Sequence, residues 1–126
     1  MAIKNKNVRL EIFLKFNGRC AYCGRNITPK QMQIDHYWPQ FLAHLQPEKD
    51  NNREENLMPS CQKCNIHKHG MRPEVWRDEL ERQVTMLRKN AQFDRALRFG
   101  QIQIIEKPIL FYFEICDNDN GDDPYP

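Results

Sequence analysis

The segments CAYCG, residues 20–24, and CQKCN, residues 61–65, each hold two cysteines separated by two residues. This spacing lets both sulfurs of a pair point to one centre, and four thiolates bind Zn²⁺ tetrahedrally at about 2.3 Å. A site with four protein ligands has no open position, so it is structural and not catalytic. The two pairs therefore predict one structural zinc site, formed by Cys20, Cys23, Cys61 and Cys64.

Two disulfides or free buried thiols are the alternatives for these cysteines. The N-terminal segment mixes charged residues with apolar ones and lacks the apolar block of a signal peptide, which disfavours disulfides. A redox pair is disfavoured because neither pair lies in a βαβ pattern. Cys116 lies outside both pairs and has no assigned role.

Length and charge limit the class of protein. The 126 residues fit one domain, and no apolar run approaches the roughly 18 residues of a membrane helix, so we expect a cytoplasmic protein. Residues 1–113 carry 19 basic and 12 acidic residues, a formal +7, whereas residues 114–126 carry five acids and no Lys or Arg. A basic body favours a polyanionic partner, although many solvated surfaces have a similar charge.

Hydrophobic spacing predicts the elements around the cysteines. Residues 5–17 have helical spacing and are followed by Gly18, a stop signal. Residues 31–35, QMQID, alternate as in a strand, and residues 57–61, LMPSC, predict a brief second strand. Residues 62–70 predict a helix that ends at Gly70. The order of elements between the cysteine pairs is therefore strand, polar loop, strand and helix.

The chain after residue 70 predicts a helical and hairpin extension followed by a tail. A helix is expected from Pro73 to about residue 90 or 99, continuous or broken near Asn90. Residues 102–115 predict two strands around the turn EKP, and residues 117–126 an acidic disordered tail. The expected organisation is one domain over residues 1–116, with a motif core at 18–70 and an extension at 71–116.

Three polar signals lie between the cysteine pairs or next to them. The segment QIDHYWPQ, residues 33–40, contains Asp35 and His36, REENL contains Asn56, and Asn65 directly follows Cys64. In this order, residues 18–70 resemble the HNH endonuclease family, also called ββα-metal or His-Me finger nucleases, in the branch braced by two C-x2-C pairs. The resemblance implies a small α+β fold with a zinc-braced ββα core, to which the chain adds flanking helices and a C-terminal hairpin.

The resemblance also implies a role for each polar residue. His36 would be the general base, Asp35 and Asn65 would bind a catalytic Mg²⁺ or Mn²⁺, and Asn56 would hold the loop and orient the base. Histidine titrates near neutrality, and carboxylate and amide oxygens suit such a hard cation. The implied activity is hydrolysis of DNA to 5′-phosphate and 3′-hydroxyl ends.

Two further residues follow from the expected helix over residues 62–70. His69 would share a face with Asn65 and could be a further metal ligand or touch phosphate, or it could be a solvated helix-end histidine. Lys68 fits the lysine of the family and could contact phosphate. Asp35 and His36 are neighbours, which point to opposite faces of a regular strand, so both can serve one phosphate only if the strand ends or kinks between them.

Other interpretations remain open at this point. A non-enzymatic zinc module that binds nucleic acid or protein through an inactive site is the rival to a nuclease, and four intact polar positions disfavour it. DNA is the expected partner, RNA as substrate stays open, and double-strand cleavage would favour a homodimer. No membrane partner is expected.

Overall fold

The computed structural model describes residues 5–116, which divide into two compact units. The first contains residues up to Pro73 together with those from Leu110, and the second spans Glu74–Ile109. The boundary after Pro73 lies close to the expected end of the motif core at residue 70. No helix within residues 5–116 is long and apolar enough to cross a membrane.

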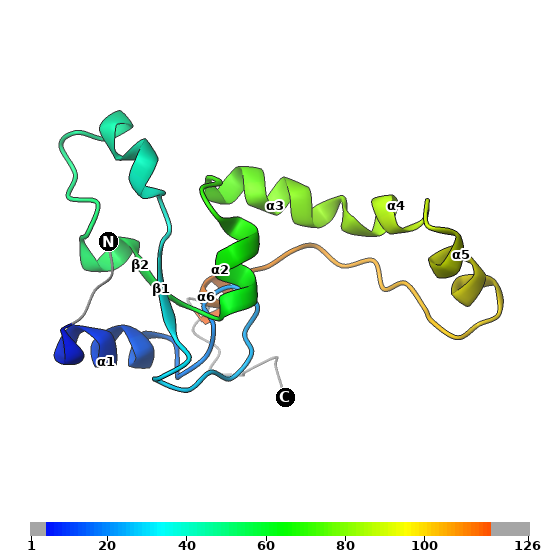
Figure 1. Cartoon of the computed structure of the whole chain (residues 1–126), viewed down its shortest axis with the longest axis horizontal. Coiled ribbons are helices and arrows are strands. Elements are labelled where there is room, and N and C mark those ends of the chain that lie inside the picture. The colour runs from blue at the N-terminus through cyan, green and yellow to red at the C-terminus, as the bar shows by residue number, and fades with distance from the viewer. Residues whose placement is uncertain (1–4, 117–126) are drawn as a thin grey trace. The chain divides into compact units, whose positions relative to one another are not determined.

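A two-stranded antiparallel sheet and one helix form the centre of the first unit (Figure 1). Strand β1 (Gln33–His36) pairs with β2 (Leu57–Ser60), with Asp35 opposite Met58 and His36 opposite Leu57. Helix α2 (Gln62–Lys68) follows β2 after one residue and contacts β1. The expected ββα core is therefore confirmed.

Helix α1 (Lys6–Lys15) packs on β2 and is the helix expected over residues 5–17. Asn5 caps its N-terminus by accepting hydrogen bonds from the next turn. At the other end, the Lys15 ammonium donates to the carbonyls of Glu54 and Leu57, at 2.8 and 3.0 Å. Lys15 thus joins α1 to the end of the loop between the strands, which contains the short 3₁₀ helices η1 (Gln40–Leu45) and η2 (Glu54–Asn56).

The second unit contains the rest of the expected long helix in separate pieces. Most of α3 (Pro73–Glu81) lies in it, followed by α4 (Gln83–Leu87) and α5 (Ala91–Arg98). Of the two alternatives left open near Asn90, the structure has the broken helix: the Asn90 side chain accepts the Phe93 N–H and caps a new helix. Within this unit the Arg77 guanidinium donates to the Ile109 carbonyl at 2.6 Å and so holds the end of the segment that follows α5.

The expected C-terminal hairpin is wrong. Residues 102–111 form no strand, and Tyr112–Cys116 forms the helix α6. The Glu114 carboxylate accepts the Phe111 N–H, as in a capping box, so the apolar spacing here is helical. The Tyr112 and Phe113 N–H groups donate to the Tyr22 and Ala21 carbonyls, which docks α6 on the first cysteine pair. The expected tail, residues 117–126, lies outside the described residues.

Candidate active site and metal centre

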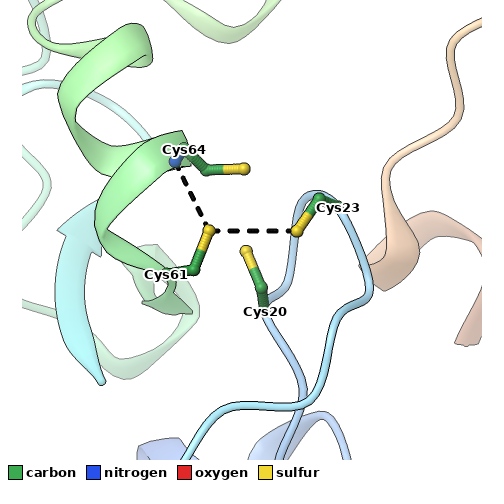
Figure 2. A group of neighbouring side chains, drawn as sticks. All are labelled: Cys20, Cys23, Cys61 and Cys64. Carbon is green, nitrogen blue, oxygen red and sulfur yellow. Dashed lines mark hydrogen bonds between the residues drawn. The ribbon is translucent and has the colours of Figure 1, made fainter. Parts of the chain in front are cut away.

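The four paired cysteines converge on one point (Figure 2). All four Sγ atoms lie within 4.8 Å of one another, and Cys23 Sγ lies 3.9 Å from Cys61 Sγ. A tetrahedron of sulfurs with metal bonds of about 2.3 Å has edges of about 3.8 Å. The cluster can therefore hold a tetrahedral metal ion with little movement of the thiols.

Local backbone geometry builds each half of this cluster. In the first pair, the Gly24 N–H donates to the Cys20 carbonyl, and Gly24 has a φ of +78°, a region open to glycine. In the second pair, Cys61 is the N-cap of α2 and its sulfur accepts the Cys64 N–H at 3.4 Å (Figure 2). A glycine turn and a helix start therefore face each other across the metal position.

The thiols influence one another strongly because they are so close. A hydrogen bond with Cys23 lowers the pKa of Cys20 well below its ordinary value, and the same contact raises the pKa of Cys23 to about 11. A hydrogen bond with Cys20 raises the pKa of Cys64. One thiolate is thus stabilised by its protonated neighbours, whereas four together require a cation.

A second feature of the first unit is a cavity of about 620 Å³ beside β1 and α2. The end of β1 contributes Asp35 and His36, and α2 contributes Asn65, with His69 just after the helix. The loop after β1 adds Phe41 to the lining. Four residues proposed for catalysis or cation binding therefore share one cavity. Asp35 and His36 both belong to the paired part of β1, so the expected end or kink between them is absent, although both residues line the cavity.

Asp35 is buried and is held by two donors on one of its oxygens. Tyr22 Oη donates to Asp35 Oδ2 at 2.5 Å, and burial raises the pKa of Tyr22, so the phenol keeps its proton. The Lys68 ammonium lies 3.0 Å from the same oxygen. Within residues 5–116 no hydrogen bond uses Asp35 Oδ1, so this oxygen is available to a ligand.

The predicted phosphate contact of Lys68 needs correction. Its side chain has no exposed surface, and its ammonium donates to the His36 carbonyl at 3.0 Å in addition to pairing with Asp35. A side chain enclosed in this way cannot reach a phosphate from solvent. Its position on the inner face of α2 instead makes Lys68 a link between the helix and the end of β1.

His36 is held through one ring nitrogen. Its Nε2 lies 2.7 Å from Asn52 Oδ1 and 3.4 Å from Gln40 Nε2. No described residue forms a hydrogen bond with His36 Nδ1. A histidine anchored by one nitrogen with the other open has the arrangement that a general base requires.

Asn56 joins the two ends of the loop that follows β1. It is 2% exposed, and its Oδ1 accepts the Trp38 N–H at 2.7 Å. Its Nδ2 donates to the carbonyls of Asn51 at 2.7 Å and Trp38 at 3.2 Å. These contacts position the loop that contains Asn52 against the strand end that contains His36.

Asn65 lies in the middle of α2, and His69 directly follows the end of this helix. The Asn65 Nδ2 donates to Gln33 Oε1 at 2.6 Å, which orients the amide and leaves its oxygen for another partner. The His69 N–H donates to the Asn65 carbonyl, and the exposed His69 ends the helix with a φ of +48°. A cation between Asp35 and Asn65 would meet one carboxylate and one amide oxygen.

Three residues that position the site were not found by sequence reasoning. Gln33 precedes Asp35 by two, so strand periodicity could have placed both on one face. Tyr22 lies between Cys20 and Cys23, and a residue of a cysteine pair gives no sequence signal for a hydrogen bond to Asp35. Asn52 lies in a polar loop without periodicity, and no sequence signal distinguishes it from Asn51.

The comparisons with known proteins agree with this geometry. The model of the HNH endonuclease family matches residues 20–70. This segment, residues 20–70, is therefore similar to HNH endonucleases. The matched segment contains both cysteine pairs, the two strands and α2. It also contains the cavity residues Asp35, His36, Asn65 and His69. The resemblance to the HNH family is thus confirmed, and it supports a nuclease-type activity in general.

One solved structure is also similar to this chain. It is the Type II-C Cas9 enzyme from Actinomyces naeslundii, with 32% sequence identity over 58% of this chain and a TM-score of 0.48. The match covers 7% of that enzyme, so this chain corresponds to a small part of it. No curated protein matches this chain significantly.

Proposed function

We propose that this chain is a metal-dependent DNA endonuclease that leaves 5′-phosphate and 3′-hydroxyl ends. The observation that carries the proposal is the shared cavity of Asp35, His36, Asn65 and His69, inside the segment that matches the HNH family. A base, a buried carboxylate and an orienting amide meet there on rigid elements. A module that only binds nucleic acid has no need for that combination.

Two kinds of metal fit the residues present. The thiol cluster suits zinc, since four sulfurs within 4.8 Å of one another fit its tetrahedral geometry and leave no position for substrate. Asp35 Oδ1 and the Asn65 amide oxygen suit Mg²⁺ or Mn²⁺, because both are hard oxygen ligands in an open cavity. When bound, the hard cation would stabilise negative charge on the phosphate and on the leaving 3′ oxygen.

His36 would take the proton from the attacking water. Its Nε2 is occupied by Asn52, so Nδ1 is the nitrogen that would receive that proton. Asn56 would act at one remove, since its three strong hydrogen bonds hold the loop that orients the imidazole. Residues 1–113 carry a formal charge of +7, which favours a polyanionic substrate.

The test is cleavage of supercoiled plasmid by the purified zinc-loaded chain, with and without Mg²⁺ or Mn²⁺. His36→Ala should lower the cleavage rate by about 10²- to 10⁴-fold, the usual contribution of a general base. His44→Ala is the matched control, because His44 is an exposed histidine of the same loop outside the cavity lining. Added Mg²⁺ should partly rescue Asp35→Ala and should not rescue His36→Ala.

The substrate and the enzymatic reading are tested in the same assay. A structured RNA of equal length, incubated alongside the plasmid, should be cut more slowly than DNA. Cleavage of RNA alone would change the substrate in the proposal. If the parent chain binds DNA and cuts neither substrate with any divalent cation, the chain is a non-enzymatic nucleic-acid-binding module and the nuclease proposal is wrong.

A further inference from the structure

The contact between His36 and Asn52 is the shortest hydrogen bond of the proposed base. It joins the end of β1 to a loop residue 16 positions later in the chain, over 2.7 Å between Nε2 and Oδ1. The amide of Asn52 lies on the exposed side of the loop and has no other hydrogen-bond partner among the described residues. Among the described residues, the one hydrogen bond of the Asn52 side chain is therefore with the imidazole.

The chemistry of this contact fixes which nitrogen carries the proton. A carbonyl oxygen only accepts, so a neutral imidazole must place its hydrogen on Nε2 to form the bond. The lone pair then remains on Nδ1, which forms no hydrogen bond with a described residue. Gln40 Nε2 approaches the same ring nitrogen at 3.4 Å, the outer limit of a hydrogen bond, and competes weakly with a contact 0.7 Å shorter.

The loop does not need the Asn52 side chain for its own structure. The backbone N–H of Asn52 donates to Asp50 Oδ1 at 2.9 Å, and the Arg53 N–H donates to the Asp50 carbonyl at 3.1 Å. The Asn56 side chain closes the loop beyond this point. A change of the Asn52 side chain should thus leave the backbone in place and alter the contact with His36.

We propose that Asn52 is a positioning residue that holds His36 as the Nε2–H tautomer, with Nδ1 directed to the water. The role of Nδ1 toward the attacking water rests on the proposed nuclease function. The assignment of the tautomer depends only on the hydrogen bond between His36 and Asn52. The tautomer of His36 depends on which atom of the Asn52 amide faces the ring. The amide oxygen accepts from Nε2–H, whereas the amide nitrogen would donate to Nε2 and favour the tautomer with its proton on Nδ1.

Two substitutions separate these arrangements. Asn52→Asp has nearly the same shape and can only accept at neutral or basic pH, so it imposes the Nε2–H tautomer. Asn52→Leu has a similar volume and cannot accept. Glu48→Ala is the control, an exposed change in the same loop whose side chain contacts neither His36 nor the cavity.

The first measurement is the ¹⁵N spectrum of the His36 ring in the full zinc-loaded chain without substrate. It is recorded at about pH 8.5, where an ordinary imidazole is neutral. The parent and Asn52→Asp should both show a protonated Nε2 and an unprotonated Nδ1, whereas Asn52→Leu should show averaged tautomers. A parent ring with its proton on Nδ1 would overturn the proposal.

The second measurement is plasmid cleavage at the same pH, with kcat and KM determined separately. Asn52→Leu should lower kcat by about 10- to 100-fold with KM unchanged, because the base is misplaced and not removed. Asn52→Asp should keep kcat within about threefold, and Glu48→Ala should match the parent. An Asn52→Leu rate equal to the parent rate would refute the positioning role. A parent without nuclease activity would refute the proposed function instead, and the spectrum would still decide the tautomer.

Discussion

The buried ion pair between Lys68 and Asp35 gives the most direct test of the site, through the substitution Lys68→Met. Methionine fills similar space and removes the charge, so the Asp35 carboxylate, whose side chain is 8% exposed, loses its counter-ion. Removing one partner of a buried pair costs about 3–5 kcal/mol because the other charge stays buried. With a urea slope of about 2 kcal/mol per molar, the unfolding midpoint should fall by about 1.5–2.5 M.

The assay is equilibrium urea unfolding of the zinc-loaded chain, followed by far-UV circular dichroism. Lys63→Met is the matched control, because Lys63 is an exposed lysine of the same helix and should change stability by less than about 0.5 kcal/mol. The double variant Lys68→Met with Asp35→Asn removes both charges and should recover much of the loss. This reasoning fails if Lys68→Met unfolds like the parent and binds DNA with a weaker salt dependence, since Lys68 would then contact phosphate after all.

Three other predictions concern the metal centre and the residues around the base. Metal analysis should find about one zinc per chain, lost in Cys61→Ser and kept in Cys116→Ser; a metal-free Cys61→Ser with the parent melting curve would exclude a structural ion. Asn56→Ala should lower the free energy of unfolding by about 1–3 kcal/mol, because it leaves the part-buried Trp38 N–H without its acceptor. In the cleavage assay it should slow the reaction with the Mg²⁺ dependence unchanged, and a variant with shifted Mg²⁺ dependence would place Asn56 on the cation. Tyr22→Phe should lower stability by about 1.5–3 kcal/mol, the range for a hydrogen bond to a charged group, and a neutral effect would mean that Lys68 alone satisfies Asp35.

Residues with strong spacing signals were placed well from the sequence. The cysteine pairs predicted their own convergence, because two residues between thiols and a helix start leave few geometries. The alternation of QMQID and the short LMPSC predicted β1 and β2, because strand spacing depends on residues close in the chain. The candidate site residues came from the resemblance to the HNH family and not from spacing, since Asp35 and Asn65 lie far apart in the chain.

The errors have a different origin. The hairpin prediction failed because residues 111–115 read equally well as strand or helix, and docking on the backbone of Ala21 and Tyr22 decided for the helix. Lys68 was misread because a lysine near a helix end is usually solvated, and only the fold shows that it is enclosed. Asn52 could not be selected because its partner, His36, lies across a loop with no periodic pattern.

The shortness of the sheet has a consequence for how the chain folds. Two strands of four residues each form a ladder that is marginal in water without further support. They are joined across the long loop from residue 37 to residue 56, and the entropy of closing that loop must be met before the ladder gains any energy. The thiol cluster brackets the same region, since it joins Cys23 to Cys61. Zinc binding by the thiols would lower the entropy cost of closing the loop between the strands. The refolding rate of the strand pair should therefore rise with zinc concentration.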